Sequence, residues 1–393
     1  MNAPLPTPTK VTAKSILRVA LYYGFAGFGG GYSVLAQLRR DLVEERRWLD
    51  AEDFLVLAEL SKSLPGTPAT TLLALLGQRV GGVRGGVVAA AAFLFPSTVL
   101  MILCGAAYAL MRKATGLGVF FDGMNAAMVG VVAATTLDLA KSALRNRWDV
   151  VAALACAVLL AARVLSEPAI AVAAIAFGVA RAVAKQKKPP PSDEPPPKSE
   201  RLHGISPWVL LLGSGAGAIA GLVRVFGPIG VMTFGGGLAM IPAIEHTVVV
   251  EQHWIGPKTF ADAVALGQIT PGPVAICATF IGYRVGGIVG ALVATLSMFG
   301  PAIALALAAG HSVERFRRSP LVESSLRALA PAVIGMLAAA TFSLGRAGID
   351  DAIGAVVAVL SFALLWRFKA SPLWMLVGGG LVHVGMFLIR AHA

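Results

Sequence analysis

Charged side chains are scarce in this sequence. Only 14% of its 393 residues are Asp, Glu, Lys or Arg, whereas 56% are hydrophobic. A soluble globular chain carries about 25% charged residues, so most of the surface of this protein has to face something other than water. The scarcity of charge excludes an ordinary soluble domain and predicts an integral membrane protein whose main partner is the lipid bilayer.

Cysteine is also scarce, and motifs for cofactors are lacking. Cys104, Cys156 and Cys277 lie singly in apolar segments, which indicates small packing residues rather than a disulfide framework or a metal site. No Gly-x-x-x-x-Gly-Lys-Ser/Thr phosphate-binding loop is present, so no cofactor is expected and any pumping has to use an ion gradient. The histidines show no spacing typical of a catalytic or metal site, so the sequence does not favour an enzyme.

The formal net charge of +12 does not indicate a nucleic-acid partner. No basic face is interleaved with aromatic residues, as a nucleic-acid-binding surface would require. The lysines and arginines instead separate apolar segments, which is the pattern that the positive-inside bias of membrane loops produces.

Apolar runs long enough to cross a bilayer, which takes about 20 helical residues, are present in both halves of the chain. Clear cases are 89–111, 118–140, 288–310 and 326–344. The sequence therefore predicts an all-α integral membrane protein with about ten transmembrane helices. Each half is expected to begin with a broken helix, at 14–38 and at 219–244. The ordinary spans that follow are 85–111, 118–140, 148–165, 167–184, 288–311, 321–345, 349–366 and 371–390.

The sequence contains an internal duplication. The motif at 28–31, Phe-Gly-Gly-Gly, recurs at 234–237, which is 206 residues later, and Pro65-Gly66 recurs at the same offset as Pro271-Gly272. Chance agreement between apolar segments would match Ala and Leu, but it would not match Arg, Trp and Pro-Gly in order. The chain is therefore expected to comprise an N-terminal tail (1–13), a first repeat (14–184), a Pro/Lys-rich cytoplasmic linker (185–206) and a second repeat (207–393).

The Pro-Gly segments at 53–82 and 259–287 are expected to form two re-entrant helical hairpins, because each arm has about 11 to 16 residues and is too short to span. Each repeat then crosses the membrane an odd number of times, so the two repeats are expected to have inverted topology. Loop charges favour this arrangement with the N-terminus outside. Arg46-Arg47 before Trp48 is replaced by Gln252-His253 before Trp254 in the second half.

The glycine triplets are candidate breaks in the first helix of each half. Unwound glycines free backbone N–H groups, and N–H groups at the start of a half-helix attract anions. Secondary transporters with inverted repeats place such breaks at a substrate site near the midplane. Close packing of helices through small residues is the alternative. The candidate residues are Gly29, Gly30 and Gly31 in the first half and Gly235, Gly236 and Gly237 in the second.

The Pro-Gly motifs are the second pair of candidate binding elements. Proline stops the preceding helix and suits the first turn of the next one, so each motif directs N–H groups towards a hairpin tip. Non-helical backbone at membrane depth has to be lined by protein or water, and a structural turn at the membrane edge is the alternative. The candidate residues are Pro65 and Gly66 at the first tip and Pro271, Gly272 and Pro273 at the second.

Arg18 and Arg224 are the basic residues of greatest interest, because each lies in an apolar stretch about ten residues before its glycine triplet. An arginine within a span usually faces a cavity or a partner, and two guanidinium groups could neutralise a divalent oxyanion. Snorkelling to the membrane interface is the alternative. Lys62, Arg79 and Arg284 are candidate supporting residues, and the two arginines among them could instead fix each hairpin to its neighbour.

These features together resemble the two-domain form of the chromate ion transporter family. The resemblance rests on the Phe-Gly-Gly-Gly break, on Pro-Gly-Pro at 271–273 and on Gly-Tyr-Arg-Val-Gly-Gly at 282–287, and it covers 14–130 and 219–335. It implies proton-driven export of chromate, or of a similar divalent oxyanion such as sulfate, across the cytoplasmic (inner) membrane. The expected mechanism is alternating access by a secondary transporter, with a passive anion channel as the alternative. A homodimer is left open.

Overall fold

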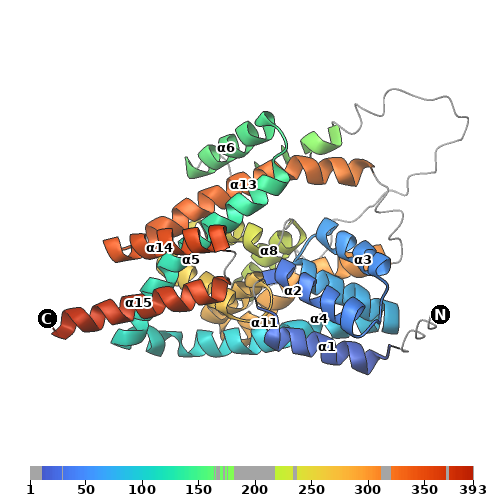
Figure 1. Ribbon diagram of the computed structural model, residues 1–393, viewed down its shortest axis with the longest axis horizontal. Helices are drawn as coiled ribbons and strands as arrows, with labels where there is room; N and C mark the ends of the chain where they lie inside the picture. The colour runs from blue at the N-terminus through green and yellow to red at the C-terminus, as the bar shows by residue number, and fades with distance from the viewer. Residues whose placement is uncertain are drawn as a thin grey trace, which may run out of the picture.

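The protein is described by a computed structural model that covers residues 11–28, 30–162, 164, 169–170, 173–174, 176–180, 217–232, 237–310, 320–368 and 371–392. Every regular element in this part of the chain is helical, which confirms the prediction of an all-α protein. Figure 1 shows a bundle whose long helices lie roughly along one direction, with α6 and α13 at the top and α1 and α4 at the bottom.

The elements of the first half are α1 (Ala13–Ala26), α2 (Gly30–Arg39), η1 (Arg40–Glu45), α3 (Ala51–Ser63), α4 (Pro68–Lys113), α5 (Thr115–Ala143) and α6 (Arg147–Ala161). Those of the second half are α8 (Gly217–Met232), η3 (Gly237–Met240), α9 (Ile241–Glu245), η4 (His246–Glu251), α10 (Pro257–Ile269), η5 (Val274–Ile276), α11 (Cys277–Gly310), α13 (Pro320–Gly348), α14 (Ala352–Phe368) and α15 (Pro372–His392).

Five helical segments of the described chain are long and apolar enough to cross a membrane. They are Pro68–Lys113, Gly116–Lys141, Val274–Gly310, Arg327–Gly348 and Pro372–His392, and two shorter apolar helices are Gly217–Val231 and Ala352–Phe368. Large apolar side chains are exposed along these helices, as lipid-facing surfaces require. Trp366 and Trp374, near the ends of two of them, are 48% and 67% exposed, and Trp148, at the start of α6, is 69% exposed. The total of about ten spans stays a prediction, since 185–206 and half of 167–184 lie outside the described residues.

The two longest helices are each interrupted by a glycine pair. In α4 the interruption is at Gly81 and Gly82, and in α11 it is at the equivalent Gly286 and Gly287. The second glycine of each pair has a positive φ, +62° and +60°, which L side chains rarely adopt. The chain then folds back on itself: a Cβ on Gly77 would lie 2.4 Å from the carbonyl oxygen of Gly85, so the start of α4 packs antiparallel to its long second part.

Each half therefore contains a hairpin of two short helices, as predicted. We call them hairpin 1 (α3 and 68–80) and hairpin 2 (α10 and 277–285). Their tips turn at Gly66 and Gly272, with φ of +105° and +111°, so glycine is required at both tips. Helices α3 and α10 have 13 residues each. At 1.5 Å per residue this is about 20 Å, which is less than the ~30 Å hydrocarbon core of a bilayer.

The long parts of α4 and α11 pack against each other in opposite directions. Gly86 of α4 approaches Leu307 in the long part of α11, whereas Gly105, further along α4, approaches Tyr283 in the preceding arm of hairpin 2. Because Gly282 of this arm packs on Gly290, Gly105 lies near the start of the long part. The contacts are also reciprocal, because Gly310, the equivalent of Gly105, packs on Gln78, the equivalent of Tyr283. Reciprocal contacts between equivalent residues are what a two-fold relation between two units produces.

A second reciprocal pair joins the remaining helices of the two halves. Gly130 of α5 lies against the carbonyl oxygen of Ala358 in α14, and Gly335 of α13 lies against the carbonyl oxygen of Ala153 in α6. A Cβ at these glycines would be 2.2 and 2.4 Å from the opposing oxygens, so the helices are in backbone contact, as small residues permit in membrane proteins. The halves are thus interleaved rather than side by side.

Candidate functional site

The first helix of the first half is interrupted, as predicted, but the interruption comes just before the glycine triplet, and Gly30 and Gly31 are helical rather than unwound. Helix α1 ends at Ala26, where the N–H of Gly27 donates to the carbonyl of Tyr23 at 2.8 Å, and α2 begins at Gly30. Gly30 and Gly31 are therefore the first residues of a new helix, so their N–H groups have no intrahelical acceptor. Gly29 lies outside the described residues.

The first helix of the second half ends at the corresponding place. Helix α8 ends at Met232, and the next described element, η3, begins at Gly237. Gly235 and Gly236 lie outside the described residues, so the conformation of the break itself is known only in the first half.

The tip of hairpin 2 lies at the break of the first half. The N–H of Gly272 donates to the carbonyl oxygen of Gly27 at 2.9 Å. On its other side the tip approaches its own half's break, because a Cβ on Gly237 would lie 3.3 Å from the backbone nitrogen of Ala275. Pro271, Gly272 and Pro273 are all buried. Non-helical backbone is thus enclosed by protein, which is the condition for such backbone at membrane depth.

Each hairpin tip also packs on the long helix of the other half. Gly272 approaches Ser97 of α4, with 3.1 Å between its ideal Cβ position and Ser97 Oγ. Gly66 approaches Ala302 of α11, the residue equivalent to Ser97, with 2.6 Å between the Cβ positions. Pro65 of this tip is half-buried and Gly66 is buried. The tips therefore lie between the two halves.

Helix N-termini supply the polar groups of this region. Helix α4 begins at Pro68 directly after the first tip, and the 3-10 turn that leads into α11 begins at Val274 directly after the second. Two buried hydroxyl groups, those of Thr67 and Thr70, lie 2.7 Å apart at the start of α4. The start of a helix carries unsatisfied N–H groups and a partial positive charge, so each of these ends, like the start of α2, is suited to an anion.

The structure does not bring Arg18 and Arg224 into this region by any contact. Both side chains are exposed, on α1 and α8, and neither makes an ion pair or hydrogen bond with a described residue. Their exposed positions agree better with the snorkelling alternative than with a lining of the site.

Two of the supporting residues make contacts within hairpin 1, and the third contacts the other half. Arg79 pairs with Asp53 at 3.0 Å across the two arms of hairpin 1, and Lys62 pairs with Glu59 at 3.0 Å on α3. Arg284 lies over the ring of Tyr108, 5.5 Å from its centroid. Arg79 therefore joins the two arms of its own hairpin. Arg284, whose partner Tyr108 lies on α4, fits the alternative in which an arginine fixes its hairpin to a neighbour.

The largest polar constellation of the described chain surrounds Asp262 of hairpin 2, and sequence reasoning missed it. Asp262 is 0% exposed. Its carboxylate accepts from Arg112 Nε at 2.9 Å and Nη2 at 3.1 Å, from the Tyr108 hydroxyl at 2.5 Å and from Asn125 Nδ2 at 2.6 Å. These partners lie on α4 and α5, 137 to 154 residues earlier in the chain, so no local motif could reveal them.

Further ion pairs extend this constellation to the surface. Asp122 of α5 accepts from Arg112 at 2.8 Å and from Lys258 of α10 at 3.1 Å, and Lys258 also pairs with Asp350 at 2.7 Å. We call these residues together the Asp262 cluster; its members are Tyr108, Arg112, Asp122, Asn125, Lys258, Asp262 and Asp350.

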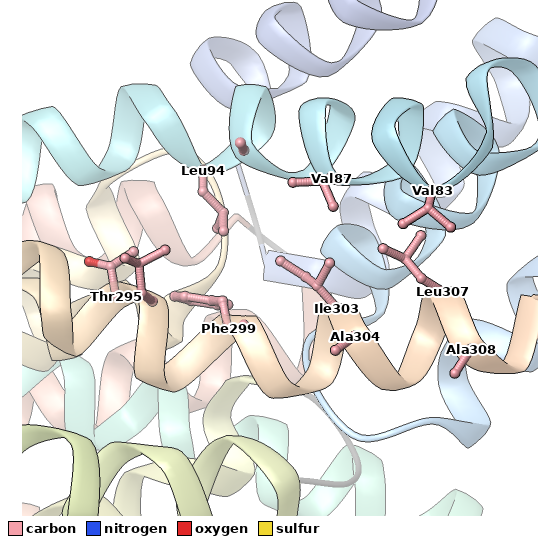
Figure 2. Close-up of a pocket in the computed structure, with 12 residues that line it drawn as sticks. Val83, Val87, Leu94, Thr295, Phe299, Ile303, Ala304, Leu307 and Ala308 are labelled. Atoms are coloured by element: carbon pink, nitrogen blue, oxygen red, sulfur yellow. The ribbon is translucent and has the colours of Figure 1, made fainter. Parts of the chain in front are cut away.

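The long apolar groove of the protein is a different place from this polar region. It measures about 550 Å³ and lies between α4 and α11, where Val83, Val87 and Leu94 point towards residues of α11 (Figure 2). Thr295 is the sole lining residue with a polar side chain. An apolar groove of this kind cannot compensate the desolvation of an anion. Among the described residues, no group of His, Cys, Asp and Glu could hold a metal ion.

Long apolar helices, two hairpins too short to span and a broken first helix define a multi-pass membrane protein built from two related halves. A family model described as chromate transporter matches the chain twice, over residues 14–180 and 220–384. The chain belongs to the chromate transporter family.

Curated relatives agree with this membership. The chain is 30% identical over 397 residues to the chromate transport protein of Cupriavidus metallidurans, covering 96% of each chain, and 28% identical to that of Pseudomonas aeruginosa, covering 92% and 89%. It is also 30% identical to the uncharacterized transporter YwrA of Bacillus subtilis, which matches 38% of this chain and 88% of its own length. No solved structure matches.

Proposed function

We propose that the protein is a secondary active transporter that exports chromate, or a similar divalent oxyanion such as sulfate, across the cytoplasmic (inner) membrane. The transport is driven by the proton gradient and proceeds by alternating access. The observation that carries this proposal is the hydrogen bond from Gly272 N–H to the Gly27 carbonyl at 2.9 Å, which joins the tip of one half to the helix break of the other. Family membership and the names of the relatives support chromate as the cargo.

The anion is bound by backbone N–H groups at the glycine breaks and hairpin tips. Chromate and sulfate are both tetrahedral dianions, so a ring of N–H donors from helix starts suits either of them. The buried state of the second tip supports a site shielded from water, where such donors act most strongly on a charge. The proposed N–H donors are Gly29, Gly30, Gly31, Gly66, Gly235, Gly236 and Gly237. Pro65, Pro271 and Pro273 have no N–H and shape the hairpin tips, and Gly272 joins the second tip to the break through its bond to Gly27.

The two repeats, 14–184 and 207–393, have inverted topology, and hairpins 1 and 2 enter the membrane from opposite sides. The antiparallel course of the equivalent helices α4 and α11 supports this topology, because equivalent spans of parallel repeats would run in the same direction. The reciprocal glycine contacts support a pseudo-two-fold axis between the repeats.

The proposal of alternating access is based on a difference in burial between the two hairpins. On α3 one face is open: Leu55 is 49% exposed, and Glu59 and Lys62 are exposed with it. At the equivalent positions 261, 265 and 268 of α10, all three side chains are buried. The difference supports a state in which hairpin 2 closes the path to one side while hairpin 1 leaves the other side accessible.

Inside-out membrane vesicles with and without the protein test the proposal. Labelled chromate should accumulate only in vesicles that contain the protein and only while a proton gradient is maintained, and sulfate in excess should compete. Equilibration of chromate that is unaffected by collapse of the gradient would instead support a passive channel. Absence of any chromate or sulfate flux would exclude the proposed cargo.

A further inference from the structure

Asp262 is the one carboxylate of the described chain whose side chain is 0% exposed, and it lies at the boundary between hairpin 2 and the other half. All the groups that donate hydrogen bonds to it belong to the first half: Tyr108 and Arg112 on α4, and Asn125 on α5. Hairpin 2 therefore cannot move away from α4 and α5 without breaking every one of these hydrogen bonds. A carboxylate in such a position controls whether that movement can occur.

The ion pairs of the cluster are arranged so that the loss of one negative charge leaves no cation alone. Three carboxylates share two cations: Arg112 pairs with Asp122 and Asp262, and Lys258 pairs with Asp122 and Asp350. If Asp262 separates from Arg112 as an anion, it becomes an unpaired buried charge, which is strongly unfavourable. If Asp262 separates as a neutral acid, Arg112 still has Asp122.

Asn125 offers a partner to the neutral acid as well. Its Nδ2 donates to the carboxylate of Asp262 at 2.6 Å, whereas its Oδ1 is buried and has no hydrogen-bond partner among the described residues. A buried acceptor without a donor is rare in native proteins. A protonated Asp262 carries an O–H donor, which is the group that this vacant acceptor lacks.

We propose that Asp262 is the positioning residue of the gate formed by hairpin 2, and that uptake of a proton by its carboxylate releases this hairpin from Arg112. This inference rests on the proposed function. A proton from the side on which the gate opens binds to an oxygen of Asp262 and the ion pair with Arg112 breaks. When the gate closes, Arg112 displaces the proton, which leaves towards the side that hairpin 1 keeps accessible. One proton thus moves opposite to the exported anion in each cycle.

Other titratable and charged groups surround Asp262, and the experiment has to separate their effects from its own. They are Tyr108 and Arg112 on α4, Asp122 on α5, Lys258 on α10, Arg284 on α11 over the Tyr108 ring, Asp350 after α13, and the pair of Asp351 with His383 of α15. His383 and Asp351 have 3.6 Å between Nε2 and Oδ1, and neither contacts Asp262 in the structure.

The equivalent residues Gln268 and Lys62 provide matched reporters of gate opening that require no cargo. Gln268 is 8% exposed and its Nε2 is 3.8 Å from Met128 Sδ of α5, whereas Lys62 is exposed. Gln268→Cys and Lys62→Cys are introduced separately into a chain in which the three native cysteines are replaced by alanine. Labelling with N-ethylmaleimide is measured in membranes between pH 5.5 and 8, and the rate at position 268 is divided by the rate at position 62.

The expected result is that this ratio rises as the pH falls, because protonated Asp262 opens the gate. In the Asp262→Asn background the ratio should be about tenfold higher at pH 8 and independent of pH, since an amide cannot take part in the ion pair. Asp262→Glu should restore the pH dependence. Asp53→Asn, which removes the exposed ion pair of hairpin 1, is the control and should leave the ratio unchanged.

A ratio that does not change with pH in the parent chain overturns the proposal, whether or not the Asn variant folds. The same holds if Asp53→Asn raises the ratio as much as Asp262→Asn does. If the parent chain transports no oxyanion but shows the expected labelling ratios, the proposed function is overturned, whereas the proposed role of Asp262 in opening hairpin 2 stands. In reconstituted vesicles, Asp262→Asn should retain exchange of labelled for unlabelled chromate and lose accumulation driven by a pH gradient.

Discussion

Hairpins 1 and 2 derive from the same duplicated segment, yet they hold different positions in the molecule. Both turn at a glycine with positive φ, and both fold back on a glycine pair. The helix α10 of hairpin 2 is buried from 260 to 268, whereas α3 of hairpin 1 exposes one face. The backbone turns are therefore common to both hairpins, whereas the side chains determine which hairpin is buried against the rest of the protein.

The charged residues of the two hairpins also differ. Position 262 of hairpin 2 is a buried aspartate, and its equivalent in hairpin 1 is Val56. Hairpin 1 has the pair of Asp53 and Arg79 instead, with both side chains about half exposed, at 49% and 48%. An exact two-fold arrangement would surround both hairpins with the same polar contacts, so the difference shows that the two hairpins are not interchangeable.

The largest effect is expected at the hairpin tips, where the two hairpins are most alike. Gly66→Ala and Gly272→Ala place a Cβ at φ of +105° and +111°, which costs of the order of 1–3 kcal/mol, and at Gly66 the Cβ would clash with Ala302. Transport of chromate in vesicles should fall about a hundredfold, as it does when a binding group is displaced by ~1 Å.

Gly227→Ala serves as the control for the tip variants, because nothing lies within 4 Å of its Cβ position and alanine favours a helix. It should leave transport unchanged. Full activity of both tip variants would contradict the placement of the tips at the anion site.

The second prediction compares the two carboxylates. Asp262→Ala removes one partner of a buried pair and should lower the free energy of unfolding by about 3–5 kcal/mol. Asp53→Ala removes an exposed pair and should lower it by about 1 kcal/mol or less. Thermal unfolding of the detergent-solubilised protein, followed by size-exclusion chromatography, checks the order. Equal losses in the two variants would show that the hairpins are held equally.

The third prediction concerns Arg18 and Arg224. Both are exposed, so Arg18→Gln and Arg224→Gln should change the rate of chromate transport by about threefold or less, as expected for interfacial anchors. Initial rates at saturating and at low chromate measure this change. If either variant abolishes transport while the protein stays in the membrane, the arginine serves the anion directly, as the sequence alone had suggested.

The smallest effect is expected on the open face of hairpin 1. Lys62 and Glu59 form an (i, i+3) pair on α3 with side chains that are 38% and 60% exposed, so Lys62→Ala should destabilise the protein by about 0.2–0.5 kcal/mol. Gln268→Ala, at the equivalent position, should cost more because Gln268 is buried against Met128. A larger loss of thermal stability from Lys62→Ala would mean that the face of α3 is covered in the membrane.

Much of the backbone could be anticipated from the residues alone. The helical class, the presence of a break next to the first glycine triplet and the turn of each short hairpin follow from local chemistry. Apolar runs, glycines and Pro-Gly pairs each determine the backbone conformation at their own positions. The fold-back at Gly81-Gly82 was not anticipated as a turn with positive φ, although the recurrence of the pair at 286–287 was its signal.

The candidate site was predictable only in part. The tips and breaks were identified as a set because they recur, but the sequence could not show that the tip of one half meets the break of the other. The role of the two arginines in the site stays a prediction, because helical periodicity in a uniformly apolar stretch does not tell an outer face from an inner one. Hydropathy likewise shows that a helix spans the membrane but not which of its faces points inward.

By itself, the sequence determined that this protein lies in a membrane, that it is helical, that it consists of a duplicated unit and where each unit is interrupted, because composition, period and glycine chemistry act locally. Only the tertiary structure decided that the halves interleave, that Asp262 of one half is held by Arg112 of the other, and that one hairpin is covered while its equivalent is open. These outcomes depend on contacts between residues more than a hundred positions apart, and no local preference of the chain encodes which of them form.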